Sequence, residues 1–151
     1  MDGRDATTRV VSLVRATGPL EGVRALLLDG AVLGGFNVLD LDALHQRLGL
    51  PVVALTRRPP EFARIRAALR KWFPHDAGRR WELLTAHRLF RVPTAGRPIL
   101  AASVGCSQAD ARRLVERTTV RGYWPEPLRL AHLVASAGRP RTGAGRRRPK
   151  N

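Results

Sequence analysis

Residues 23–55 constrain the fold more than any other part of the chain. An apolar run over residues 23–28 ends on the pair Asp29-Gly30, and a second apolar run, residues 51–55, follows about one helix later. Apolar runs of this length between chain-breaking residues are typical of buried strands in a parallel sheet. Because ligands gather at the carboxyl ends of such strands, Asp29 is a candidate site residue. Asp-Gly is also a common turn pair, and the local pattern alone slightly favours a turn or capping role.

The rest of the chain alternates between helical and strand-like patterns. Helices are expected over residues 6–16, 42–48, 60–73, 107–118 and 127–137, and further strands over 52–56 and 99–104. Residues 80–92 are ambiguous. They suit a short helix and then a strand that ends near Val92 and pairs with 99–104 as a hairpin. This alternation indicates one α/β domain over residues 1–138.

Several local signals refine this outline. Asp5, Asp42 and Ser107 stand where helix N-caps are expected, and Asp110 follows Ser107 by three residues as in a capping box. The segment 127–137 is apolar nearly all round, which predicts a helix packed into a core. A sheet of so few strands is also expected to leave an exposed edge.

The net charge of +15 in 151 residues indicates a polyanionic partner, most often nucleic acid. All but two of the 27 basic residues are arginines, a skew that a GC-rich coding bias also produces. Residues 139–151 carry six of the positive charges and are expected to form a disordered basic tail. No stretch approaches the ~20 apolar residues of a membrane span and no secretory signal is present, so a cytoplasmic location without membrane partners is expected.

Four sequence blocks together resemble the archaeal endonuclease dU family. They are DGRDAT at 2–7, LLLDG at 26–30 with GGFNVLDL at 34–41, LGLPVVAL at 48–55 with RRPP at 57–60, and PEPLRLAHLVASA at 125–137. The resemblance implies a relative of endonuclease V, with a ribonuclease-H-like mixed sheet of five strands and flanking helices. It also implies a metal-dependent endonuclease of DNA repair, with Mg²⁺ or Mn²⁺ as cofactor, that cuts DNA near deoxyuridine or another deaminated base.

The same resemblance assigns roles to individual residues. Asp29 matches a metal ligand, and Asp40 matches a second catalytic carboxylate that binds the metal or orders a metal-bound water. The residues assigned to nucleic-acid binding are Asn37, Arg57, Arg58 and Arg129. Structural roles compete evenly for two of these residues, since Asn37 also suits a turn and Asp40 a helix-entry cap.

Other residues have mainly structural interpretations. Glu126 is expected to cap the last helix, and His132 to be a buried core histidine. Cys106, the single cysteine, lies at a helix start where its pKa could be lowered, although a buried thiol is commoner. A small-molecule α/β enzyme has little support, because no glycine-rich phosphate fingerprint or nucleophile elbow is present.

The chain departs from the family at its amino terminus. Family members begin with an extra segment that carries an early acidic motif, so the sheet is expected to be incomplete and the cleavage activity is in doubt. A misassigned start codon is the favoured explanation, ahead of a decayed remnant or a protein that binds without cutting. The alternative function is therefore a non-catalytic nucleic-acid-binding protein, which would use the arginines of residues 60–73 and 107–118 and the basic tail. The oligomeric state is open.

Overall fold

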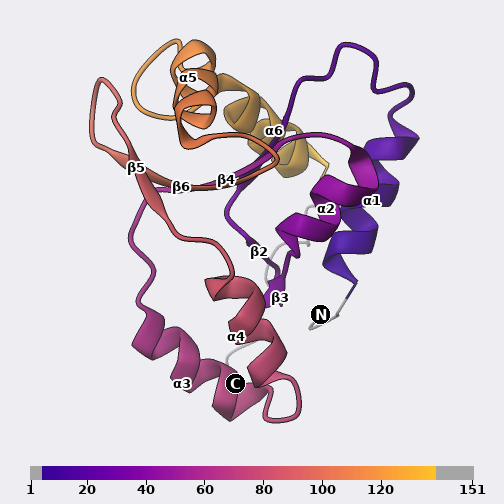
Figure 1. Ribbon diagram of the computed structural model, residues 1–151, viewed down its shortest axis with the longest axis vertical. Coiled ribbons are helices and arrows are strands. Elements are labelled where there is room, and N and C mark those ends of the chain that lie inside the picture. Colours follow the sequence, from indigo (N-terminus) through magenta and orange to yellow (C-terminus); the bar gives the residue numbers. More distant parts are fainter. Residues whose placement is uncertain (1–4, 139–151) are drawn as a thin grey trace, which may run out of the picture.

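Helices and strands alternate in the computed structural model, which describes residues 5–138 (Figure 1). The helices are α1 (Ala6–Ala16), α2 (Leu41–Leu48), α3 (Phe62–Trp72), α4 (Ala77–Thr85), α5 (Gln108–Thr118) and α6 (Glu126–Ala137). The strands are β1 (Leu26–Asp29), β2 (Val32–Leu33), β3 (Asn37–Val38), β4 (Val52–Thr56), β5 (Phe90–Val92) and β6 (Ile99–Val104). The α/β class expected from the sequence is confirmed.

The main sheet has the strand order β1-β4-β6-β5. Strands β1 and β4 are parallel, with Asp29 opposite Leu55, whereas β6 is antiparallel to both β4 and β5. The mixed sheet and the β5–β6 hairpin are therefore confirmed. The main sheet has four strands among the described residues, whereas the resemblance implied five. The ribonuclease-H-like topology stays a prediction.

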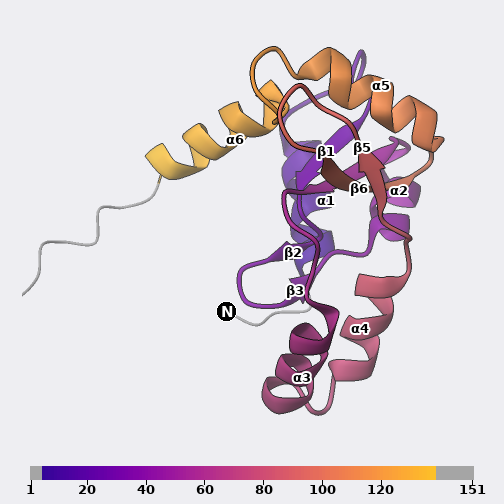
Figure 2. The ribbon, with the colours of Figure 1, turned by 90° about the vertical axis from the view of Figure 1, so that its left-hand side faces the viewer.

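Strand β4 divides the core into two layers because successive side chains point to opposite faces of a sheet. Val52 and Ala54 belong to a cluster with residues of α1 and α2, including Leu44. Val53 and Leu55 belong to a second cluster with residues of α5 and the start of α6. Figures 1 and 2 show these two helix pairs on opposite sides of the sheet.

Strand β1 occupies one end of the sheet and is only half-buried. It begins at Leu26, three residues later than predicted, because the Val23 N–H donates to the Leu20 carbonyl (3.0 Å) and closes a turn. Within residues 5–138 no strand pairs with its outer side, as the prediction of an exposed edge requires.

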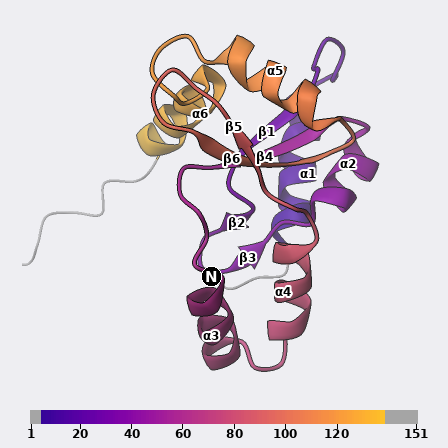
Figure 3. The same ribbon diagram turned by 60° about the vertical axis from the view of Figure 1, so that its left-hand side comes forward.

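Helices α3 and α4 form a hairpin that extends away from the sheet (Figure 3). Helix α3 begins at Phe62, two residues after the predicted start at Pro60, and Leu69 is its one buried residue. Trp72, the last residue of this helix, is 65% exposed. The hairpin is held partly by edge-to-face contacts between Phe62 and Trp81, whose ring centroids are 5.9 Å apart. The second helix begins at Ala77, three residues before the ambiguous segment defined from the sequence.

The prediction that the last helix packs into a core was wrong. Leu128 in its first turn is buried, but Leu130 and Leu133 are each 59% exposed and Val134 is 73% exposed. Figure 2 shows α6 extending outward from the rest of the molecule, so its later turns do not pack against the sheet. No helix within residues 5–138 has the length and apolarity needed to cross a bilayer. The predicted tail, 139–151, lies outside the described residues.

The helix caps differ from the predictions at two of three sites. Ser107 caps α5 as expected, since its Oγ accepts from the Asp110 N–H (3.1 Å). Asp40, and not Asp42, caps α2: its Oδ1 accepts from the Ala43 N–H (2.9 Å). The carboxylate of Asp5 makes no cap bond to α1.

Asp5 pairs instead with Arg9, whose guanidinium holds the pKa of that carboxyl below its usual value. The side chain of Asn37 takes over at the start of α1, where its Oδ1 accepts from the Ala6 N–H at 3.4 Å. Sequence reasoning missed this contact because the acceptor comes from β3, far along the chain.

Candidate functional site

Asp29 lies at the carboxyl end of β1, beside the end of its parallel neighbour β4. Its side chain is 42% exposed, and its Oδ2 lies 3.4 Å from an Nη of Arg57. Arg57 follows β4 directly, so the parallel register of the two strands brings this cation to the carboxylate. The predicted placement of Asp29 at a strand end is therefore confirmed, and its chemical role stays a prediction.

Arg57 also lies over an aromatic ring. Its guanidinium carbon is 3.9 Å from the ring centroid of Trp124, within the range of a cation–π contact. Trp124 lies in the loop before α6 and is only 5% exposed. Its indole Nε1 has no hydrogen-bond partner among residues 5–138. A stack of Asp29, Arg57 and Trp124 thus links the strand ends to the block that begins at Pro125.

The residues around Asp29 do not by themselves fit a metal centre. Within the part of the chain that the structure describes, no three His, Cys, Asp or Glu side chains come together in a way that could hold a metal ion. Hard divalent cations take several oxygen ligands, usually more than one carboxylate. Asp29 offers one carboxylate there, and the group bonded to it is the cation of Arg57.

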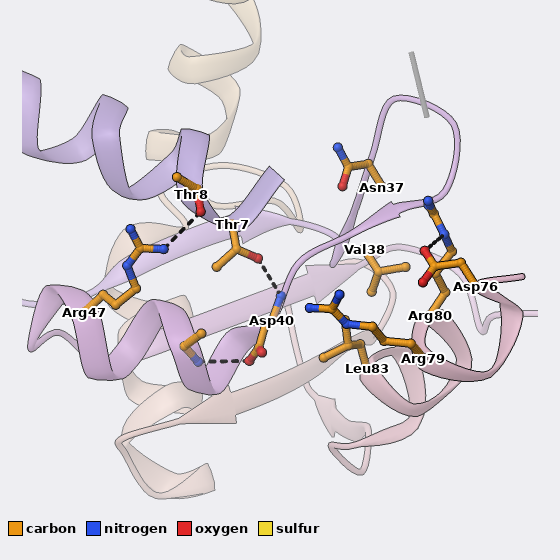
Figure 4. Close-up of a pocket in the computed structure, with 11 residues that line it drawn as sticks. Thr7, Thr8, Asn37, Val38, Asp40, Arg47, Asp76, Arg79, Arg80 and Leu83 are labelled. Carbon is orange, nitrogen blue, oxygen red and sulfur yellow. Dashed lines mark hydrogen bonds and ion pairs between the residues drawn. The ribbon is translucent and has the colours of Figure 1, made fainter. Parts of the chain in front are cut away.

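Asp40 and Asn37, predicted to act with Asp29, line a different, polar cavity (Figure 4). Asp40 Oδ1 caps α2, which is the structural alternative considered for it. The amide of Asn37 is also engaged, with Oδ1 accepting from Ala6 and Nδ2 donating to Asp5 Oδ1 (3.3 Å). Both residues therefore hold the first turns of α1 and α2 in place.

The polar cavity has a volume of about 190 Å³ and lies between α1, α2, β3 and α4. Its cationic side chains are Arg47, Arg79 and Arg80. Arg80 is buried and pairs with Asp76, with Nε and Oδ2 2.8 Å apart, and also donates to the carbonyl of Phe36. Phe36 has a φ of 60°, in the left-handed region, and this bond from α4 fixes its carbonyl in that turn.

An apolar cavity of about 230 Å³ lies next to the strand ends. Gly30 and Thr56, which directly follow Asp29 and Leu55, form one side of it, and Phe62 and Ile65 of α3 form another. His87 also lines the cavity, and its Nε2 is 2.9 Å from Asp42 Oδ2. Sequence reasoning missed this cavity because its walls come from elements that are separate in the chain.

The remaining residues predicted to bind nucleic acid are exposed and lie far apart in the chain. Arg58 follows Arg57, and its side chain makes no ion pair or hydrogen bond within residues 5–138. Arg129 is 57% exposed on α6 and pairs with Glu126, Nε to Oε2 3.0 Å. Glu126 makes no cap bond, contrary to expectation. His132 is exposed on the outer part of α6 and is not the buried core histidine predicted.

Cys106 is a half-buried thiol just before α5. Burial raises its pKa above the ordinary value, and the charge of Asp110 adds to the rise against a lowering contact with Ser103. A thiol with a raised pKa is a poor nucleophile at neutral pH. This outcome agrees with the interpretation of Cys106 as a buried cysteine without a catalytic role.

Comparison with known proteins finds relatives along nearly the whole chain. The family model for Endonuclease dU matches residues 1–138. The chain belongs to the endonuclease dU family. The resemblance carried by the four sequence blocks is thereby confirmed.

Individual relatives of this endonuclease dU protein are known as UPF0215 proteins. One from Methanosarcina barkeri is 35% identical over 89% of this chain and 69% of that protein. A relative from Thermococcus gammatolerans is 42% identical over 91% of this chain and 69% of that protein. One from Deinococcus radiodurans is 40% identical over 97% of this chain and 72% of that protein. The chain therefore spans roughly seven tenths of the length of these relatives.

A solved structure shares the fold. The crystal structure of a protein of unknown function from Archaeoglobus fulgidus has a TM-score of 0.81 to this chain at 32% identity. The match covers 90% of this chain and 76% of that one. The arrangement of helices around a mixed sheet is therefore common to both proteins.

Proposed function

We propose that this endonuclease dU family member is a metal-dependent endonuclease that cuts DNA near deoxyuridine or another deaminated base. The observation that carries the proposal is the position of Asp29 at the carboxyl end of β1, where α/β sheets gather their ligands. Family membership supports a nuclease, and the net charge of +15 supports a polyanionic substrate. Action on DNA also accords with a cytoplasmic location.

Mg²⁺ or Mn²⁺ is the proposed cofactor, because phosphodiester hydrolysis requires strong neutralisation of charge around the scissile phosphate. Among residues 5–138 no three metal-ligating side chains come together, so we expect these residues to bind such an ion weakly. A working metal centre would need carboxylates from outside the described residues. The roles of the described residues can be argued without the ion.

Arg57 is the residue best placed to act with Asp29. In the structure it balances the Asp29 carboxylate while its other face lies on Trp124. A DNA phosphate at the strand ends would compete with Asp29 for this guanidinium, since arginine binds phosphate and carboxylate in the same way. Binding of the backbone would thereby release the carboxylate for its own role, and the exposed Arg58 adds a second cation beside it.

The apolar cavity beside Asp29 suits a base taken out of the stack. Enzymes that recognise a damaged base commonly hold it in a pocket with apolar or aromatic walls. Here Phe62 and Ile65 supply apolar surface, and His87, with Asp42 behind it, supplies a polar edge. We propose that a deaminated base near the cleavage position is held here.

Cleavage of an oligonucleotide with a single deoxyuridine, with Mg²⁺ or Mn²⁺, tests the proposal. Because residues 5–138 bind such an ion weakly, we expect the wild-type chain to cut it slowly and Asp29→Asn to lose most of that activity. Glu116→Gln, which removes one acidic charge from exposed α5, is the matched control and should cut as the wild type does. Equal cutting by Asp29→Asn and wild type would remove Asp29 from the mechanism, and no cutting by the wild type would favour the second candidate.

A non-catalytic nucleic-acid-binding protein is the second candidate. It is favoured by the lack of a three-acid cluster among residues 5–138, together with exposed arginines on α3 and α5. Its mark would be binding that weakens steeply with salt and is unaffected by a chelator. Binding that changes little between low and high salt would contradict it.

A further inference from the structure

We propose that the polar cavity between α1, α2 and α4 is a binding site for a phosphate group. This site goes beyond the proposed nuclease chemistry, because Asp29 is not among its lining residues. Its lining combines two threonines with Arg47 and Arg79, beside the acid-paired Arg80, at one cavity of about 190 Å³ (Figure 4). That volume leaves room for a tetrahedral anion.

The two threonines of the first turn of α1 are set up as hydrogen-bond donors. Thr7 Oγ1 accepts from the Asp40 N–H (3.0 Å), and Thr8 Oγ1 accepts from an Nη of Arg47 (3.1 Å). Each hydroxyl is thus used as an acceptor, and within residues 5–138 neither proton has an acceptor of its own. A hydroxyl held in this way has its proton available for an anion.

Arg79 provides the charge that the cavity does not balance. Its side chain extends from α4 toward Asp40 (Figure 4), and it forms no hydrogen bond or ion pair among residues 5–138. Arg47 gives one bond to Thr8, a neutral partner, so its charge is not offset by an acid either. The two guanidinium groups reach the cavity from different helices, as a clamp on a phosphate requires.

The acids of the cavity are already engaged. Asp76 pairs with Arg80, and these side chains are 11% and 6% exposed. Asp40 caps the first turn of α2, where the positive end of the helix offsets part of its charge. The cavity therefore has an excess of donors and positive charge, which selects an anion, and arginine forks with hydroxyls suit phosphate oxygens.

Phosphate of two sources has this chemistry, the backbone of a nucleic acid and a free mononucleotide. The test measures binding of deoxyuridine monophosphate, and of a short oligonucleotide without terminal phosphates, by isothermal titration calorimetry. We compare the wild type with Arg79→Ala, Arg79→Lys and Thr8→Val. Arg117→Ala is the control, since it removes an exposed arginine of α5 at the other end of the molecule.

We expect Arg79→Ala to weaken binding of one of the two probes by about tenfold, the usual effect of losing a hydrogen bond to a charged group. Arg79→Lys should recover part of the affinity, and Arg117→Ala should keep the wild-type affinity for the mononucleotide. Loss with the oligonucleotide assigns the site to the backbone, and loss with the mononucleotide assigns it to a free nucleotide. Wild-type affinity of Arg79→Ala for both probes, or no binding of either probe by the wild type, would overturn the proposal. In an Asp29→Asn background, Arg79→Ala should weaken binding by the same factor as in the wild type, which separates the site from the nuclease proposal.

Discussion

Replacement of Asp76 by alanine is expected to destabilise the protein strongly. The carboxylate of Asp76 accepts from Arg80 Nε at 2.8 Å, and the two side chains are 11% and 6% exposed. Arg80 also donates to the Phe36 carbonyl, and its guanidinium carbon lies 4.3 Å from the ring centroid of Phe73. In Asp76→Ala the guanidinium would remain buried by these contacts after losing the Asp76 carboxylate.

The magnitude follows from that burial. Removing one partner of a buried ion pair typically lowers the free energy of unfolding by about 3–5 kcal/mol. Domains of this kind have about 5–15 kcal/mol in all, so the loss would be a large fraction of the total. The exposed pair of Glu61, which precedes α3, and Arg64 in α3 gives the matched comparison, with side chains 67% and 82% exposed. Glu61→Ala is expected to lower the stability by less than about 1 kcal/mol.

Urea denaturation followed by circular dichroism measures both values by linear extrapolation. The double variant Asp76→Ala/Arg80→Met, which replaces the buried charge by an apolar chain, should recover part of the loss. If Asp76→Ala and Glu61→Ala lie within 1 kcal/mol of each other, burial of the Arg80 pair does not control its contribution and the reasoning is refuted.

Three further predictions concern caps, a thiol and a close contact. Asp40→Ala should lower the free energy of unfolding by about 1 kcal/mol through loss of the α2 cap, whereas Asp40→Asn should nearly retain it; equal melting of the two variants would contradict this. The raised pKa of Cys106 predicts slow alkylation of the thiol at neutral pH. When the alkylation rate is measured against pH, the midpoint of its increase should lie above pH 9.0, the ordinary thiol pKa; a midpoint at lower pH would contradict this. Gly105→Ala should lower the melting temperature, because a Cβ there would lie 2.3 Å from the His45 ring and the residue has a φ of +74°; an unchanged melting temperature would show that the ring moves aside.

The central strands could be predicted from the sequence because burial on both faces gives them continuous apolar runs. Strands β4 and β6 match their predicted bounds. The β2–β3 hairpin was missed, since each strand has two residues and Arg80 of α4 binds its turn at Phe36. The exposure of α6 was missed because apolar composition does not tell which elements are present to cover a helix.

For the candidate site, the sequence predicted the position of Asp29 but not the contacts around it. The position of Asp29 followed from an apolar run that ends on an acid, a local pattern. Its contact with Arg57, and the seat of that guanidinium on Trp124, depend on strand register and on the loop before α6. The separation of Asp40 from Asp29 also came from tertiary structure, since both acids lie in the same family block.

The outer side of β1 has a consequence for the chemistry at Asp29. Some of the backbone amides and carbonyls along Leu26–Asp29 point away from β4, on the side where no strand pairs with β1 within residues 5–138. A polypeptide that hydrogen-bonded along this side would place every second side chain on the same face as its neighbours in β1. The register of such an added segment against β1 would thus determine which side chains lie next to the Asp29 carboxylate. It would also determine how many oxygen ligands the carboxyl end of β1 offers.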